Sequence, residues 1–195
     1  DIAVGRQAFP YGLSFGRNYN SRNQYKKGVL GWGWSHNHDM TAKIGSDGFL
    51  AMGEQFAAQG AASIVELFVS VDLATDSTQP IVKLVTMSLA DKWWIDQLVN
   101  NTVTLKVSTS SKVFLKQPDG TYTAPASSPG ILTFTAGAYS LTTPQGVNYN
   151  FNTSGQISSF VTPGGVTVTW TYTSGLLTSI SNGLGRTLTL NYTSG

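Results

Sequence analysis

The motif WSHNHD, at residues 34–39, contains the side chains of this sequence that are best suited to chemistry. His36 and His38 stand at positions i and i+2, which puts both imidazoles on one face if the segment is a strand, and Asp39 follows them. Two imidazoles and a carboxylate are ligands that zinc accepts. No further ligand is evident in the sequence, so zinc binding stays an alternative and we assign no metal-binding residue.

The same motif offers Ser35, His36 and Asp39, the residue types of a hydrolytic triad. Residues this close in sequence rarely converge in space, no paired carboxylates or activated nucleophile can be assembled from the sequence, and neither a GxGxxG motif nor a P-loop is present. We therefore expect no enzyme activity and no cofactor, and we assign no catalytic and no cofactor-binding residue.

Two tryptophans precede the histidines in the run GWGWSH, which places Trp32 and Trp34 on one side of a short strand. If exposed, the pair could stack on sugar rings; if buried, it would fill the core, and we favour burial for large aromatic rings next to glycines. A small basic cluster lies nearby, which we interpret as a solvated turn. Its members are Arg17, Arg22, Lys26 and Lys27.

The composition argues against a nucleic-acid-binding protein and against a membrane-spanning helix in this sequence. Charged residues make up only 11% of the 195 residues, and from Thr121 to the end Arg186 is the only one. A net charge of +2 without a basic stripe argues against nucleic acid as a partner. Cysteine is absent, no signal peptide is visible, and no apolar run reaches the roughly 20 residues that span a membrane. Both ends look like cuts, so we expect a longer protein.

Residues 54–100 carry a helical pattern. Apolar side chains at i, i+3, i+4 and i+7 predict one amphipathic helix, and a second is expected from Ile81 to Leu98, after Pro80. The apolar positions of the first helix are Ile64, Leu67, Phe68 and Val71; those of the second are Leu84, Val85, Met87, Leu89, Trp93, Trp94, Ile95 and Leu98. A face this broad predicts packing on the β part or on a partner.

The remaining zones read as short strands joined by tight turns. Residues 1–53 are rich in glycine, asparagine and aromatics, and residues 101–195 alternate with a period of two. Around residue 170 one face carries the large side chains and the other carries threonines. The large set is Val166, Val168, Trp170 and Tyr172, and the threonines are Thr167, Thr169 and Thr171.

A phrase recurs every twenty residues near the end of the chain. YNFNTSG ends at Gly155, TWTYTSG at Gly175 and TLNYTSG at Gly195. Each unit within residues 143–195 predicts a strand, a turn, a second strand and a turn back. Because an isolated hairpin is marginal in water, three such hairpins are expected to lie side by side.

These units resemble the YD repeats of Rhs-type proteins. The Tyr-Asp pair of that family corresponds here to Phe151-Asn152, Tyr172-Thr173 and Tyr192-Thr193, so the Asp is absent in every unit. The family's Gly-Arg-Leu corresponds to Gly155-Gln156-Ile157 and Gly175-Leu176-Leu177. Asn and Thr can still form the side-chain-to-backbone bond that starts a turn.

A second match lies in residues 13–40, which resemble the segment that introduces the repeats in Rhs proteins, with the patterns RxYNS and LGxGWxHxxD. The residues at those positions are Arg17, Tyr19, Asn20, Ser21, Leu30, Gly31, Gly33, Trp34, His36 and Asp39.

The resemblance implies a mainly β (α+β) fold: antiparallel β-hairpin repeats stacked into a curved sheet, with the helical hairpin inserted. It also implies a non-catalytic role as the start of a β-shell that encloses a toxic effector used in interbacterial competition. The implied partners are downstream repeats and the C-terminal effector, with a secretion apparatus or a cell-surface partner as a further contact. The implied location is secreted or at the bacterial surface. The alternative is a surface module that binds glycans or a partner protein through aromatic-rich β faces.

Overall fold

The computed structural model describes residues 2–47, 57–74, 78–107 and 110–192. Its contacts divide the chain into two compact units. The first unit comprises Asp1–Lys43, Thr104–Lys112 and Ala124–Gly195, and the second comprises Ile44–Val103 and Val113–Thr123.

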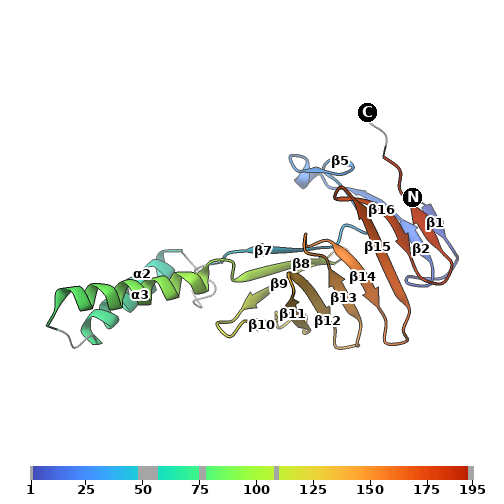
Figure 1. Ribbon diagram of the computed structural model, residues 1–195. Helices are drawn as coiled ribbons and strands as arrows, with labels where there is room; N and C mark the ends of the chain where they lie inside the picture. The colour runs from blue at the N-terminus through green and yellow to red at the C-terminus, as the bar shows by residue number, and fades with distance from the viewer. Residues whose placement is uncertain (1, 48–56, 75–77, 108–109, 193–195) are drawn as a thin grey trace. The chain divides into compact units, whose positions relative to one another are not determined.

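The main element of the first unit is a seven-stranded antiparallel sheet in which the strands follow one another in chain order (Figure 1). Its strands are β11 (Ile131–Thr135), β12 (Ala138–Thr142), β13 (Asn148–Phe151), β14 (Ile157–Val161), β15 (Thr167–Thr173), β16 (Leu176–Ser181) and β17 (Thr187–Thr189). Each strand pairs with the one before it, and every connection between them is a short turn. The predicted mainly β fold, with antiparallel hairpins and two helices, is therefore confirmed.

One face of this sheet forms the core. On β15, Val168 and Trp170 are buried while Thr169 and Thr171 are exposed, as the alternation predicts. The buried residues continue across the neighbouring strands, where Trp170 lies opposite Ile180 and Ile180 lies opposite Leu188. Each strand thus covers the apolar side chains of the next.

Three turns between hairpins are built alike. In each, the backbone N–H of a polar residue donates to the carbonyl four residues later, and the side-chain oxygen accepts from a backbone N–H within the turn. That polar residue is Thr143, Thr162 and Asn182 in turn, at spacings of 19 and 20 residues. The repeat seen in the sequence therefore corresponds to a repeated set of hydrogen bonds.

The turns within the hairpins share a second feature. The register shifts between Asn150 and Phe151, and again between Thr171 and Tyr172. The pairing leaves one extra residue in the returning strand, Ser158 in the first hairpin and Thr178 in the second. Each extra residue donates its hydroxyl to the carbonyl opposite, at 2.9 Å to Asn150 and 3.2 Å to Thr171.

The TSG phrases differ in detail. Asn152 Oδ1 accepts from the backbone N–H groups of Ser154 and Gln156, which confirms the predicted turn bond at that position. Thr173 does not form it: its hydroxyl lies 3.4 Å from that of Thr178. The reason is a tighter turn, because Thr173 pairs directly with Leu176 and leaves only two residues in the loop. The third phrase, with residues 193–195, lies outside the described residues.

The N-terminal part of the first unit consists of short paired strands and one 3-10 turn. They are β1 (Ile2–Val4), β2 (Leu13–Phe15), β3 (Arg17–Tyr19), η1 (Ser21–Asn23), β4 (Lys27–Gly28), β5 (Gly31–Trp32) and β6 (Trp34–His36). β1 pairs with β2, β3 with β6, and β4 with β5. This segment packs against the large side chains of the seven-stranded sheet. The Phe9 ring lies 4.8 Å from Phe160 and 6.4 Å from Trp170.

Backbone contacts extend this packing to the first TSG turn. The amide of Ala42 donates to the Gly155 carbonyl at 2.7 Å, and Ile157 donates to Met40 at 3.1 Å. Gly155 has φ +72, and a Cβ built there would lie 2.2 Å from the Ala42 carbonyl oxygen. Glycine is therefore required at this turn both for its φ and for the close approach.

A four-stranded sheet has the order β10-β9-β8-β7. Its strands are β7 (Thr41–Gly45), β8 (Thr102–Val107), β9 (Ser110–Lys116) and β10 (Tyr122–Thr123). In the second unit, the buried Asn101 side chain pairs with the backbone of Asp47, accepting at 2.8 Å and donating at 3.0 Å. These bonds join the two chain segments at the base of the helical insertion.

The insertion is a pair of helices, α2 (Ala57–Ala74) and α3 (Pro80–Leu98), which contact each other. Both predicted helices are confirmed; α3 begins at Pro80, one residue before the predicted Ile81. Lys83 and Asp72 join them at 3.3 Å. Among the described residues, neither helix is both long and apolar enough to cross a membrane.

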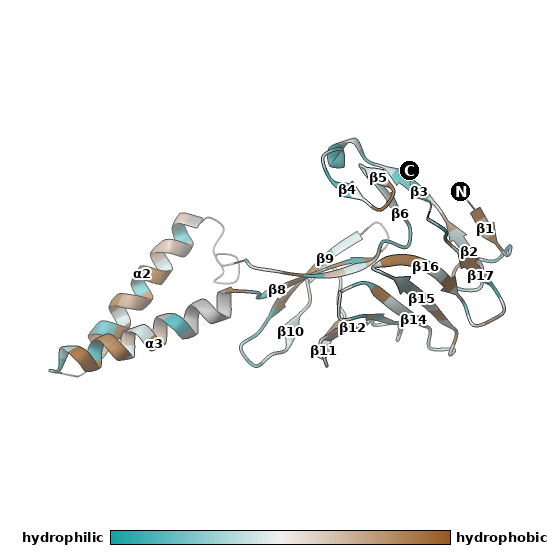
Figure 2. Cartoon of the chain, turned by 45° about the horizontal axis from the view of Figure 1, so that its top comes forward, coloured by the Kyte–Doolittle hydropathy of each residue, from teal (hydrophilic) through white to brown (hydrophobic). Residues whose placement is uncertain are grey.

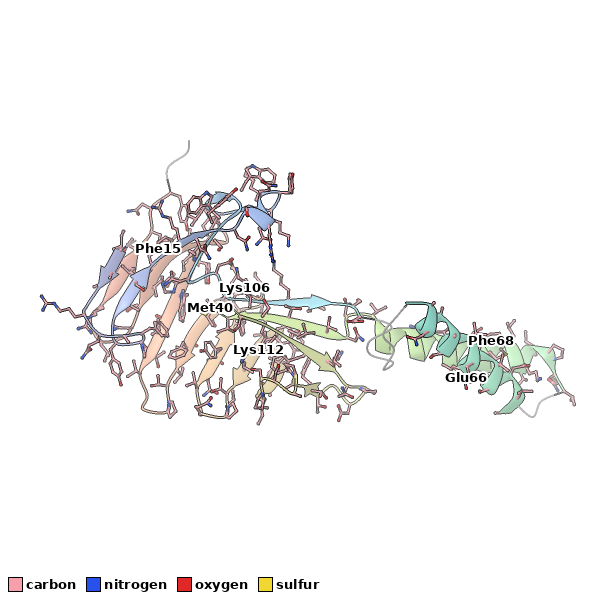
Figure 3. All side chains as sticks on the ribbon, turned by 180° about the vertical axis from the view of Figure 1, so that it is seen from behind. Phe15, Met40, Glu66, Phe68, Lys106 and Lys112 are labelled. Carbon is pink, nitrogen blue, oxygen red and sulfur yellow. The ribbon has the colours of Figure 1, made fainter. Side chains whose placement is uncertain are left out.

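The predicted apolar face is only partly covered. Of its described members, Leu67, Val71 and Met87 are half-buried or buried, whereas Ile64, Phe68, Leu84, Val85 and Leu89 are exposed. Figure 2 shows hydrophobic stretches along both helices, and Figure 3 labels Phe68 on α2. Two helices that pack only on each other cover only the side chains between them, which explains why part of the apolar face is exposed. The side chains of Trp93, Trp94, Ile95 and Leu98 lie outside those described.

Candidate functional site

His38 connects the N-terminal segment to the seven-stranded sheet. Its Nδ1 accepts the indole N–H of Trp170 at 3.2 Å, and its Nε2 lies 2.7 Å from the Ser14 carbonyl oxygen. Because an indole nitrogen only donates, Nδ1 carries no proton and Nε2 donates to Ser14. Burial is the main reason that the pKa of His38 is lowered, while the Ser14 hydrogen bond acts in the opposite direction. His38 is thus held as one neutral tautomer.

His36 lies beside it on the same aromatic surface. The Phe15 ring stacks on His36 at 5.2 Å and on His38 at 6.3 Å; Figure 3 labels Phe15. Nδ1 of His36 is buried and has no hydrogen-bond partner in the described part of the chain. Burial again lowers the pKa of His36 most strongly; Asp39 raises it and Lys106 lowers it.

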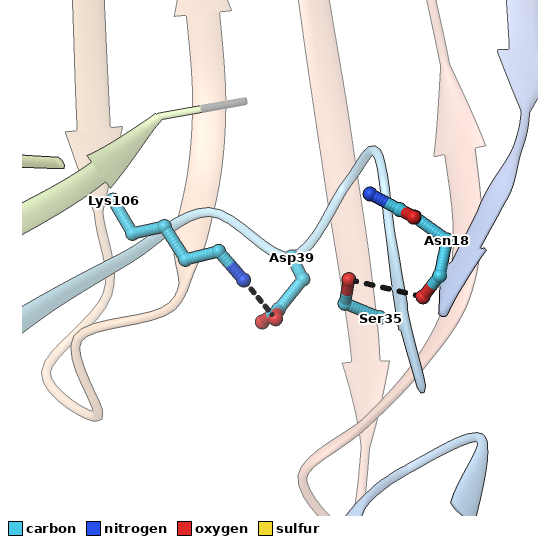
Figure 4. A network of polar contacts seen from close by, with 4 residues as sticks. All are labelled: Asn18, Ser35, Asp39 and Lys106. Carbon is cyan, nitrogen blue, oxygen red and sulfur yellow. Dashed lines mark hydrogen bonds and ion pairs between the residues drawn. The ribbon is translucent and has the colours of Figure 1, made fainter. Parts of the chain in front are cut away.

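Asp39 pairs with Lys106 rather than with a histidine. Its Oδ2 lies 2.6 Å from the Lys106 ammonium, as Figure 4 shows. Ser35 points elsewhere: its hydroxyl donates to the Asn18 carbonyl at 3.4 Å. The Ser35, His36 and Asp39 arrangement considered as a hydrolytic triad is therefore not formed.

The arrangement of the two histidines and Asp39 also does not support the zinc-binding alternative. The two histidines do share a side, stacked on Phe15, but both ring nitrogens of His38 are occupied by Trp170 and Ser14. Within the described residues, no group of three or more His, Cys, Asp or Glu side chains could hold a metal ion. The cluster instead lines a cavity of about 60 Å³, together with Gln156 and Tyr172. Burial, with Asp39 nearby, raises the pKa of Tyr172.

Residues 12–16 read Gly-Leu-Ser-Phe-Gly, which matches the GxSxG pattern of a nucleophile elbow. Such an elbow requires a sharp turn from a strand into a helix. Here Ser14 stands in the middle of β2, which is followed by strand β3. What His38 contacts is the Ser14 backbone carbonyl and not its hydroxyl. The pattern is therefore a coincidence of sequence.

The predicted burial of Trp32 and Trp34 is wrong. Trp32 is 57% exposed and Trp34 is 41% exposed. The two-stranded ribbons that carry them are too small to enclose an indole. Trp34 instead leans on Tyr19 across the β3–β6 pair, with ring centroids 5.4 Å apart. The basic cluster is exposed throughout, as predicted; it comprises Arg17, Arg22, Lys26 and Lys27.

Sequence reasoning missed residues that join the N-terminal segment to the hairpins or one hairpin turn to the next. Asn182 is fully buried and donates to the carbonyls of Pro10 (3.3 Å) and Tyr11 (2.8 Å). Gln156 donates from its side chain to the Gly175 carbonyl at 2.9 Å, which links two successive turns. The only signal available for Asn182 was its equivalence to the turn threonines; its contact with Pro10 has no local signature.

Comparison with known proteins gives one match. Residues 7–58 fit the model of a family described as "Domain of unknown function (DUF6531)". No curated protein and no solved structure matches the chain. The matched residues are a minority of the 195-residue chain, and they include Trp32, Trp34, both histidines and Asp39.

Proposed function

We propose that this chain is the start of a β-walled shell of the Rhs/YD-repeat type. Residues 13–40 would introduce the repeats, and the hairpins within residues 143–195 would form the first part of the wall. In this proposal the chain is non-catalytic and belongs to a larger polypeptide that is secreted or displayed on the bacterial surface. The wall encloses an effector domain of that polypeptide.

The observation that carries the proposal is how the N-terminal segment covers the hairpins. Phe9 packs on Phe160, His38 bonds to Trp170, and Asn182 bonds to Tyr11. Each contact joins the segment to a different hairpin strand or turn. A repeat array needs a distinct terminal element to cover its exposed apolar faces, and these contacts support that role for the segment.

The sheet edge at β17, which β2 of the N-terminal segment also contacts, is a second observation in support. Among the described residues, β17 pairs only with β16. An unpaired strand edge is a template for another strand. Since the turns at Thr143, Thr162 and Asn182 share one hydrogen-bond pattern, we expect a further hairpin of the same kind to pair with β17.

The full open reading frame provides the first test. We expect many more 20-residue units after Gly195, followed by an unrelated C-terminal domain. A stop codon shortly after Gly195 contradicts the proposal.

A second test uses the full-length protein. Limited proteolysis should leave the C-terminal domain protected, and the protection should fall in a Gly155→Ala variant, which disturbs the packing of the first turn. A Lys116→Ala variant, at an exposed side chain, serves as the control. Equal cleavage of the C-terminal domain with and without the wall would oppose enclosure.

A second candidate function is a surface module that binds glycans or a partner protein. The specific observation in its favour is the exposure of Trp32 and Trp34, since rings available to solvent can stack on sugars. Quenching of their fluorescence by a bound glycan would support it, and a blank glycan array would oppose it.

A further inference from the structure

A groove of about 770 Å³ lies in the first unit beside the tryptophan ribbon. Its volume is in the range of sites that hold small ligands. Its charged lining consists of Lys26, Lys27, Lys43, Lys106 and Asp39. Asn23, Ser35, Ser111 and Trp34 also line the groove.

The charge of the groove is unbalanced. Lys106 is neutralised by Asp39 at 2.6 Å. The ammonium groups of Lys26, Lys27 and Lys43 have no carboxylate or other partner among the described residues, and all three side chains are exposed. Three cations facing one concave surface favour an anionic occupant.

Trp34 adds an aromatic residue to the lining of the groove. It is 41% exposed, and its ring leans on Tyr19 at 5.4 Å, which restrains its orientation. The β3–β6 pairing sets Tyr19 directly opposite Trp34. An indole held in this way can pack against a sugar ring without losing much side-chain freedom on binding.

The combination of groups discriminates among anions. A nucleic acid that neutralises several phosphates needs a longer basic track than three lysines, and the net charge of +2 offers none. An acidic sugar chain needs what the groove has: ammonium groups for its carboxylates or sulfates, hydroxyl and amide groups for its hydroxyls, and one aromatic face.

We propose that the groove formed by Lys26, Lys27, Lys43 and Trp34 binds an acidic oligosaccharide. This proposal rests on the second candidate function and names its ligand class; it is independent of the shell. The two tryptophans then differ in role, because Trp34 lines the groove and Trp32 does not.

The test titrates the purified chain with oligogalacturonate, with a neutral maltooligosaccharide of similar length and with oligothymidylate of similar charge. Binding is measured by tryptophan fluorescence and by isothermal titration calorimetry. Oligogalacturonate should bind, and its affinity should fall several-fold between about 50 and about 300 mM NaCl. The neutral sugar and the oligothymidylate should each bind at least about tenfold more weakly.

Variants locate the site. The triple change Lys26→Ala, Lys27→Ala, Lys43→Ala and the single change Trp34→Ala should each weaken oligogalacturonate binding about tenfold or more. Trp32→Ala and Lys116→Ala are the matched controls and should stay within about twofold. Unchanged thermal unfolding of all four variants shows that folding is not the cause.

The outcomes separate the two proposals. Equal binding of neutral and acidic sugars, unaffected by the lysine changes, overturns the acidic groove and leaves glycan binding in place. An equal loss in Trp32→Ala overturns the location. Tighter binding of oligothymidylate overturns the ligand class, and no binding of any sugar overturns both proposals.

Discussion

Trp170 donates its indole N–H to Nδ1 of His38 at 3.2 Å, across 132 positions of the sequence, and both side chains are buried. One residue stands on β15 of the seven-stranded sheet, and the other follows β6 of the N-terminal segment. The bond requires an unprotonated Nδ1, so the attachment of the segment to the sheet depends on the charge state of His38.

The first prediction concerns pH. The pKa values of His36 and His38 are lowered from 6.5 in the folded protein, chiefly by burial. As pH falls through 6.5 the unfolded chain binds protons that the folded chain does not, so the free energy of unfolding should decrease until the lowered folded pKa values are reached. Urea denaturation at several pH values between about 7.5 and about 5 measures this.

A matched variant isolates the share of His38. Glutamine can accept from Trp170 and donate to Ser14 but does not titrate. His38→Gln should therefore flatten the decrease. A wild-type protein whose unfolding free energy is constant or rises on acidification contradicts the assignment.

The second prediction compares two glycines with nearly equal backbone angles. Gly155 has φ +72 and Gly175 has φ +78. An alanine Cβ at Gly155 would lie 2.2 Å from the Ala42 carbonyl oxygen, whereas at Gly175 nothing lies within 4 Å. Gly175→Ala should cost about 1 kcal/mol from the backbone angle alone, and Gly155→Ala about 3 kcal/mol or more. Chemical denaturation gives both values, and equal costs would show that Ala42 does not approach this turn.

The third prediction concerns the buried Asn182. Asn182→Ala removes the bonds to Pro10 and Tyr11 and also those within its own turn, and should cost about 2–3 kcal/mol. Asn182→Thr should cost about 1 kcal/mol less, because Thr143 and Thr162 build the same turn with a hydroxyl. If the unfolding free energy falls equally in both variants, a threonine hydroxyl does not replace the Asn182 side chain in stabilising this turn.

The fourth prediction uses the opposed charges beside His36. Asp39 raises the pKa of His36 and Lys106 lowers it. Asp39→Asn should therefore lower that pKa further, and Lys106→Met should raise it, as followed by NMR of the imidazole protons. The stability change should be small, about 0.2–1 kcal/mol, since both partners are partly exposed. Shifts of the same sign in both variants would exclude the charge effect.

The sequence allowed the local architecture to be predicted where a short-range pattern decides it. The alternation around Trp170 correctly predicted which face of β15 is buried, and the spacing of turn residues predicted the hairpins. Pro80 marked the start of α3. Each of these depends on neighbours within a few positions, so a linear pattern contains the information.

Contacts set by long-range packing were not predictable in the same way. The bond between His38 and Trp170 depends on how the N-terminal segment lies on the sheet, which no local period encodes. Trp34 was expected in the core because of its size, yet its ribbon has no second layer to cover it. Which rings become exposed depends on the area that a segment can enclose, and sequence spacing does not report that area.

Ser158 and Thr178 have a consequence for any longer array. Each adds a residue to one strand of its hairpin at the same point, and a bulge of this kind bends its strand and increases the local right-handed twist. If successive hairpins carry the same bulge, the bends that the bulges cause add up along the array. The curvature of a longer array is then expected to depend on how regularly this extra residue recurs.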